Sequence, residues 1–138
     1  MGTAWIPDYE LLFKGSKTGA YMTIEKKVGS RVPVAVWAVT AADEAALDRY
    51  EGFPNFYYKT EMRLKIQGIR TGKIRDRDAF VYIMHEERPI GSPSLRYVDT
   101  CLQGYRSFGF DQKYLMEAVK KADEVTRHER KQYHFYWN

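Results

Sequence analysis

Glu51 is the residue of this chain whose type and surroundings are best suited to proton transfer. It lies in the segment DRYEGFPNFYYK, residues 48–59, at the expected end of a helix and directly before an aromatic-rich stretch. A glutamate at a helix end is usually a solvated surface charge. Burial among aromatic rings would instead raise its pKa, as would the carboxyl end of the helix dipole, and a raised pKa suits acid–base work near neutral pH. The aromatic candidates for such a wall are Trp37, Tyr50, Phe53, Phe56, Tyr57 and Tyr58. The pattern leaves both interpretations open.

The other reactive side chains form no recognisable catalytic or metal-binding motif. His85, His128 and His134 lack metal-ligand spacing with one another and with Cys101, so we expect no metal site. Cys101 lies on an apolar helical stripe, which indicates a small core residue. The sequence also lacks the glycine-rich phosphate and dinucleotide motifs and the serine-hydrolase motif. We therefore expect no cofactor.

Composition limits the class of protein. Hydrophobic residues make up 44% and charged residues 29% of the 138 residues, which fits one folded domain. No apolar run is long enough to span a membrane, and the first ten residues lack the features of a signal peptide. The one cysteine excludes an internal disulfide, so we expect a cytoplasmic protein that does not bind membranes.

Basic residues give the chain a formal net charge of +4 and cluster in two segments, residues 65–77 and 120–131. Nucleic-acid binding is one interpretation of such clusters. The other interpretation is that the first segment is a solvated hairpin loop and the second a solvated helix end. We favour the second, because acidic residues interrupt both segments and neither a recognition helix nor a base-stacking motif accompanies them.

The strand patterns come mainly in the first two thirds of the chain. Residues 5–14 and 20–27 have the pattern of strands, and the latter alternates as a half-buried strand does. Residues 32–39, VPVAVWAV, are apolar on both faces and predict a central strand. Residues 58–67 and 79–86, separated by a glycine-bearing turn, predict an antiparallel hairpin.

Three helices are predicted from their start and stop signals. The segment TAAD, residues 40–43, resembles a capping box, and Gly52 ends the helix that it opens. Ser92-Pro93 predicts the start of a second helix and Asp111 that of a third. Together the elements predict an α+β domain, built on a curled, mostly antiparallel sheet or small β-barrel with flanking helices.

The order of these blocks resembles that of the γ-glutamylcyclotransferase family, also called AIG2-like. VAVWAVTAADEAALDRYEGFPNFYYKTEM resembles the core block of the family, in which an apolar strand leads through an xxLDxYEGxP helix into a tyrosine-bearing strand. FVYIM, SPSLRYVDTCLQGYRSFGFDQKYL and the upstream WIPDYELLFKGSKTGAYMTI resemble further blocks of the family. The resemblance runs from about Thr3 to Val119 of a single domain, and the basic and aromatic tail, residues 121–138, lies outside it.

The resemblance implies an intramolecular aminolysis that needs no cofactor or metal. In that reaction the α-amine of a γ-glutamyl group attacks its own γ-carbonyl, which closes 5-oxoproline and expels the amine that the group carried. Glu51 would be the general acid/base, and Tyr57, Tyr82 and Tyr97 match tyrosines that would bind the substrate. Each tyrosine has packing in the core as its alternative.

One part of the family pattern is missing. Members begin with a strand that ends in a Tyr-Gly-Ser-Asn-type loop, and this sequence contains no such loop; Gly15-Ser16 aligns to a later turn. A shortened chain, a misassigned start and a genuine loop-less protein are the three explanations. Loss of a strand would expose a sheet edge, which a second copy of the chain or the aromatic tail YHFYW could cover. We therefore expect this chain alone to be either a homo-oligomer through that edge or inactive.

Two functions therefore follow from the sequence. The first is a cyclotransferase that acts on a small-molecule γ-glutamyl amide, with Glu51 as general acid/base, provided that the missing N-terminal loop is supplied. The second is a non-catalytic domain of the same fold that binds a small molecule or a protein. The identity of the amine leaving group is open in either case.

Overall fold

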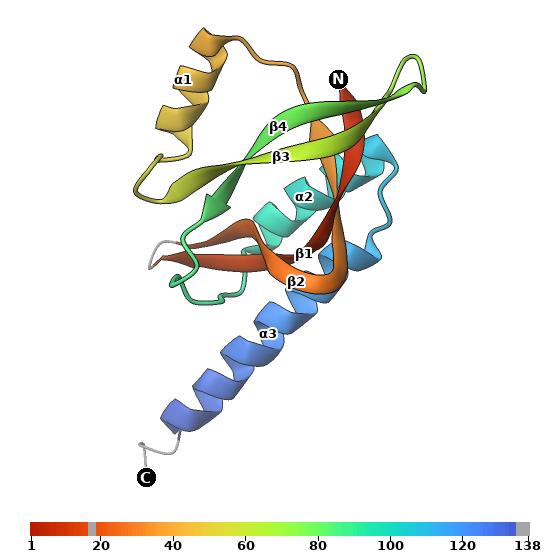
Figure 1. Ribbon diagram of the computed structural model, residues 1–138. Helices are drawn as coiled ribbons and strands as arrows, with labels where there is room; N and C mark the ends of the chain where they lie inside the picture. Colours follow the sequence, from red (N-terminus) through yellow and green to blue (C-terminus); the bar gives the residue numbers. More distant parts are fainter. Residues whose placement is uncertain (17–18, 135–138) are drawn as a thin grey trace. The chain divides into compact units, whose positions relative to one another are not determined.

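The computed structural model describes residues 1–16 and 19–134, with side chains over residues 1–15 and 19–127 (Figure 1). The elements, in chain order, are β1 (Gly2–Ser16), β2 (Gly19–Val36), α1 (Ala41–Tyr50), β3 (Tyr57–Gly68), β4 (Ile74–Met84), α2 (Leu95–Phe108) and α3 (Lys113–His134). The predicted α+β fold, a mostly antiparallel curled sheet with helices, is confirmed. The predicted role of the aromatic tail lies outside the described side chains.

The sheet has the order β2-β1-β3-β4. β1 pairs antiparallel with β3, with Gly2 opposite Gly68, and β3 pairs antiparallel with β4 over their whole length. β2 therefore stands at an end of this order, and the prediction of a central strand at residues 32–39 is wrong. The strand ends at Val36, and the apolar side chains of Trp37 and Val39 are exposed.

β2 is one long strand where two were predicted. Asp8 in β1 and Gly29 in β2 both have left-handed backbone angles, with φ of 59° and 88°. The Gly29 N–H donates to Asp8 Oδ1 at 3.0 Å. Left-handed residues within paired strands are typical of bulges, which bend a strand without ending it. Gly29 therefore marks a bend within one continuous strand, whereas the sequence pattern predicted a break between two strands.

The β3–β4 hairpin is longer than predicted, because β4 begins at Ile74, five residues before the predicted strand. Most of the basic segment 65–77 is thus strand, and the turn is confined to residues 69–73. The segment is solvated, as expected. Exposed side chains form two cross-strand ion pairs, Lys65 with Asp76 at 3.4 Å within the segment and Arg63 with Asp78 at 3.1 Å just outside it.

The predicted ends of α1 are confirmed. Thr40 accepts from the Asp43 N–H and Asp43 accepts from the Thr40 N–H, each at 3.1 Å, which is a full capping box. Glu51 is the C-cap residue. Gly52 follows with φ of 66°, the left-handed conformation that commonly ends a helix and that glycine adopts without steric cost.

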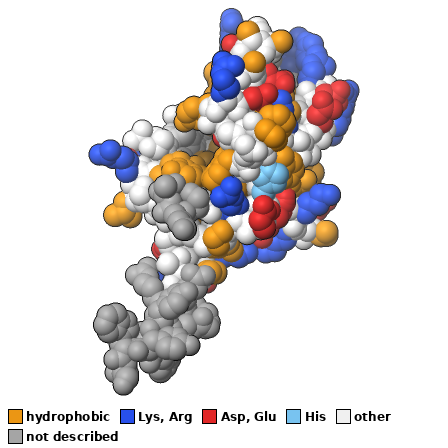
Figure 2. Space-filling view, turned by 90° about the vertical axis from the view of Figure 1, so that its left-hand side faces the viewer, with side chains coloured by type: hydrophobic (Ala, Val, Ile, Leu, Met, Phe, Trp, Pro, Cys, Tyr) orange, Lys and Arg blue, Asp and Glu red, His pale blue; other side chains and the backbone are white. Residues whose placement is uncertain are grey.

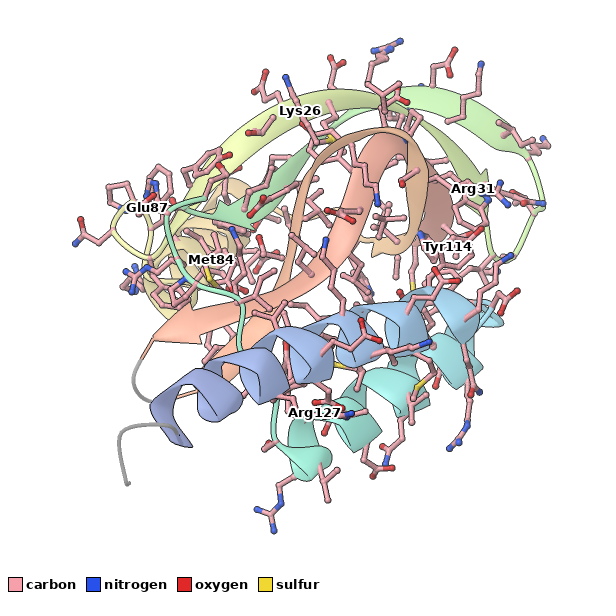
Figure 3. The ribbon with its side chains drawn as sticks, turned by 90° about the horizontal axis from the view of Figure 1, so that it is seen from below. Lys26, Arg31, Met84, Glu87, Tyr114 and Arg127 are labelled. Atoms are coloured by element: carbon pink, nitrogen blue, oxygen red, sulfur yellow. The ribbon has the colours of Figure 1, made fainter. Side chains whose placement is uncertain are left out.

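The start of α2 differs from the prediction. Ser94 is the N-cap, since its hydroxyl accepts from the Tyr97 N–H at 3.1 Å, and Ser92-Pro93 precedes the helix. The Ser92 hydroxyl instead bonds to α3, with Asp123 Oδ1 at 2.9 Å and Thr126 Oγ1 at 3.1 Å. α2 and α3 lie side by side (Figure 3). As predicted, Asp111 accepts from the backbone at the start of α3, from the Lys113 N–H.

The chain forms two compact units, and each has its own buried side chains. Unit 1 comprises residues 1–10 and 24–85, and unit 2 comprises residues 11–23 and 86–138. In unit 1 the most buried large side chains are Ile6 and Met84. The core of unit 2 consists of Phe13, Ala20, Cys101, Tyr105, Leu115, Ala118 and Ala122.

Candidate active site

Glu51 is half-buried at the carboxyl end of α1. Its N–H donates to the Leu47 carbonyl at 2.8 Å, so the residue continues the hydrogen bonding of the helix. Among the described residues no hydrogen bond or ion pair engages its carboxylate, and burial raises the pKa of that group above its ordinary value. A raised pKa makes a half-buried carboxyl that is not paired with a cation better suited to proton transfer than a fully solvated one.

The expected aromatic wall around Glu51 is only partly present. The prediction is wrong for Tyr50, which is 85% exposed, and for Trp37, which is 55% exposed, because neither side chain is withdrawn from water. Phe53 is exposed as well, at 37%, and burial begins only at Phe56. Phe56 and Tyr58 are half-buried, and Tyr57 is buried with its ring 5.0 Å from that of Phe56.

A polar network joins α1 to the hairpin of β3 and β4. Lys59 of β3 and Tyr82 of β4 are directly opposite in the strand register. Lys59 Nζ lies 2.8 Å from Glu44 Oε2 and 3.0 Å from Asp48 Oδ1, and the Tyr82 hydroxyl donates to Asp48 Oδ1 at 2.6 Å. Figure 2 shows acidic and basic side chains next to one another on the face that it presents.

These contacts fix the charge states of the network. The hydrogen bond from Tyr82, and next that from Lys59, lower the pKa of Asp48. The hydrogen bonds to Glu44 and Asp48 raise the pKa of Lys59. Burial, and next the bond to Asp48, raise the pKa of Tyr82 to about 12. At neutral pH the carboxylate of Asp48 is therefore ionised and Tyr82 keeps its proton.

His85 holds the turn between α1 and β3. Its Nε2 lies 2.6 Å from the Pro54 carbonyl oxygen, its N–H donates to the Phe56 carbonyl at 3.4 Å, and its ring is 5.2 Å from that of Tyr58. The turn that follows Glu51 is thus attached to the end of β4.

The structure places three of the four predicted site residues in unit 1. Glu51 ends α1, Tyr57 begins β3 and Tyr82 lies in β4. Tyr97 belongs to unit 2, where its hydroxyl accepts from the Met22 N–H at 3.1 Å and its ring meets those of Phe13 and Tyr21 edge to face.

Sequence analysis missed Asp48, Lys59 and His85. The spacing of Glu44 and Asp48 is a usable signal, because residues four apart share a helix face and can bind one cation together. The partner on β3 could not be found in this way, because helix and strand meet only in the folded chain.

Other sites are not evident in the described part of the chain. No group of three or more histidine, cysteine, aspartate or glutamate side chains there could hold a metal ion. Burial raises the pKa of the Cys101 thiol, which favours the unreactive protonated form. No described helix has the length and apolar character that crossing a bilayer requires.

Residues 1–100 match the model of the family described as gamma-glutamyl cyclotransferase, AIG2-like. The chain belongs to this family. No curated protein matches the sequence.

Solved structures agree with the AIG2-like fold. A structure named gamma-glutamyl cyclotransferase is 23% identical with a TM-score of 0.71, and the uncharacterized human protein LOC79017 is 22% identical with a TM-score of 0.67. Each match covers 86% of this chain and 71% of the other. YkqA from Bacillus subtilis is 13% identical with a TM-score of 0.65, and the match covers 92% of this chain and 43% of that one. At these identities the likeness shows the fold.

Proposed function

We propose that this chain is a γ-glutamylcyclotransferase-type enzyme that converts a γ-glutamyl amide into 5-oxoproline and a free amine, with Glu51 as general acid/base. The observation that carries the proposal is the half-buried Glu51 carboxyl at the end of α1, with a raised pKa, in a member of the gamma-glutamyl cyclotransferase family.

The reaction needs one group that moves protons. The α-amine nitrogen of the substrate bonds to the γ-carbonyl carbon, and Glu51 takes a proton from that nitrogen. The bond between the carbon and the leaving nitrogen then breaks as Glu51 returns the proton to it. Neither water nor an oxidant is consumed. Because nucleophile and carbonyl belong to the same molecule, proximity supplies much of the rate.

The three tyrosines are the substrate-binding residues in this proposal. Tyr57 is buried next to the turn that carries Glu51. The Tyr82 proton is donated to Asp48, so toward a substrate this hydroxyl can act only as a hydrogen-bond acceptor, which suits an ammonium group. Tyr97 is included because it matches a tyrosine of the family pattern. We further propose a cytoplasmic location and self-association through a sheet edge.

The test is release of 5-oxoproline from a panel of γ-glutamyl amides by the wild type and by Glu51→Gln. Glutamine keeps the shape but cannot carry the proton, so kcat should fall by about 10²- to 10⁴-fold with little change in KM. Glu61→Gln, on the exposed face of β3, is the control and should leave the rate unchanged. If the wild type releases no product from any substrate, or Glu51→Gln is as active as the wild type, the proposal is wrong; binding of γ-glutamyl compounds without turnover would favour a non-catalytic domain.

A further inference from the structure

Helix α1 carries Glu51, and the half-buried Leu47 is its one apolar side chain that is not exposed. None of its residues is buried, and four of its alanines, Ala41, Ala42, Ala45 and Ala46, are exposed. Short helices usually depend on a buried apolar face, because ten residues form too few hydrogen bonds to be stable alone. Other contacts must therefore stabilise α1.

The polar network provides them. Glu44 and Asp48 lie four residues apart on one face of α1, and the ammonium of Lys59 bonds to both. The Tyr82 hydroxyl adds a third bond, also to Asp48. The Lys59 ammonium lies 4.6 Å from the centre of the Phe53 ring and 5.6 Å from that of Phe80, so it is enclosed by aromatic faces as well as by acids.

Asp48 connects this network to Glu51 through the backbone. It lies three residues before Glu51, within one helical turn, and its own carbonyl accepts from the Phe53 N–H at 2.9 Å. The turn that bears Glu51 is thus hydrogen-bonded to Asp48 on one side. On the other side His85 contacts the carbonyl of Pro54. A shift of Asp48 would move Glu51 with it.

We propose that Asp48 is a positioning residue for Glu51, which holds α1 on Lys59 and Tyr82 and thereby sets the depth at which the Glu51 carboxyl lies. Asp48 need not touch the substrate. Its effect on catalysis rests on the proposed function, whereas its effect on the placement of Glu51 does not.

The experiment compares Asp48→Ala with a control, Asp76→Ala, which removes an exposed ion pair of the β3–β4 hairpin. The first readout is amide hydrogen exchange over residues 44–53. The second is the pKa of Glu51, from carbon-13 NMR titration of its carboxyl. Asp48→Ala should speed exchange at least tenfold and lower the Glu51 pKa toward 4.5, while Asp76→Ala changes neither.

The third readout is the rate of 5-oxoproline release. Asp48→Ala should lower kcat by about 10- to 100-fold through misplacement of Glu51. Lys59→Arg, which keeps the positive charge, should retain most of the activity, whereas Lys59→Met should behave like Asp48→Ala. Unchanged exchange and an unchanged Glu51 pKa in a folded Asp48→Ala protein would overturn the proposal, whether or not the wild type is active. If the wild type is inactive but Asp48→Ala speeds hydrogen exchange and lowers the Glu51 pKa as expected, the positioning role stands and the result counts against the proposed function alone.

Discussion

Glu51 affects stability in a direction opposite to that of most surface carboxyls. Burial raises its pKa in the folded state, so the folded protein binds a proton more tightly than the unfolded chain does. Between the ordinary pKa of 4.5 and the raised value, unfolding therefore becomes easier as the pH rises. Above the raised pKa the folded state carries the whole cost of the buried charge.

Glu51→Gln should consequently raise the melting temperature at pH 7 and leave it nearly unchanged at pH 3, where the wild-type carboxyl is protonated in both states. Melting curves of both proteins at a series of pH values measure this difference. An equal change at both pH values would show that the effect comes from packing and not from charge.

The chemistry of single residues was predictable where it depends on local order. The helix end and the aromatic segment that follows it could be predicted from residues 40–58. The sequence left open whether Glu51 is solvated or buried, and in the folded chain burial raises its pKa. The exposure of Trp37 and Tyr50 did not follow, because the direction of a side chain at a strand end or a helix end depends on what packs there. The contacts of Lys59 and Tyr82 could not be predicted either, because their partner Asp48 lies on a different element and meets them only in the folded chain.

At the scale of elements, the effect of replacing a glycine depends on where in a helix the glycine lies. Gly52 ends α1 with φ of 66°, and a Cβ there would lie 3.2 Å from the Phe56 Cβ. Gly104 is inside α2 with open space around it. The same substitution should therefore have opposite effects at the two positions.

Gly52→Ala should lower the free energy of unfolding by about 1–2 kcal/mol, because an L-residue in the left-handed region is strained. Gly104→Ala should raise it by about 0.5–1 kcal/mol through helix propensity. Urea denaturation measures both. A stabilising Gly52→Ala would mean that the end of α1 is not held in the left-handed conformation.

Every helix and strand could be predicted in kind, and so could the ends of α1, but the lengths of β2 and β4 could not. The capping box of Thr40 and the alternation in β3 act within a few residues, so they are visible in the sequence. The extent of β4 depends on its pairing with β3, and the continuity of β2 depends on the bond between Asp8 and Gly29. Such contacts between distant residues override the local pattern.

At the scale of the whole molecule, the core of unit 2 should dominate the response to mutation in that unit. Leu115 is fully buried in this core, whereas Leu95 at the start of α2 is 88% exposed. Leu115→Ala should lower the free energy of unfolding by about 2–5 kcal/mol, and Leu95→Ala should change it by less than about 0.5 kcal/mol. Chemical denaturation of both variants measures the difference, and equal losses would contradict the assignment of this core.

The division into two units has a consequence for how the chain could be cut or recombined. The backbone passes from one unit to the other three times, after Glu10, after Thr23 and after His85. A break after Thr23 would split both units, whereas a break after Glu10 would split unit 1 alone and a break after His85 would split unit 2 alone. Each unit consists of two separate stretches of the chain, so neither can be excised or fused as one continuous segment.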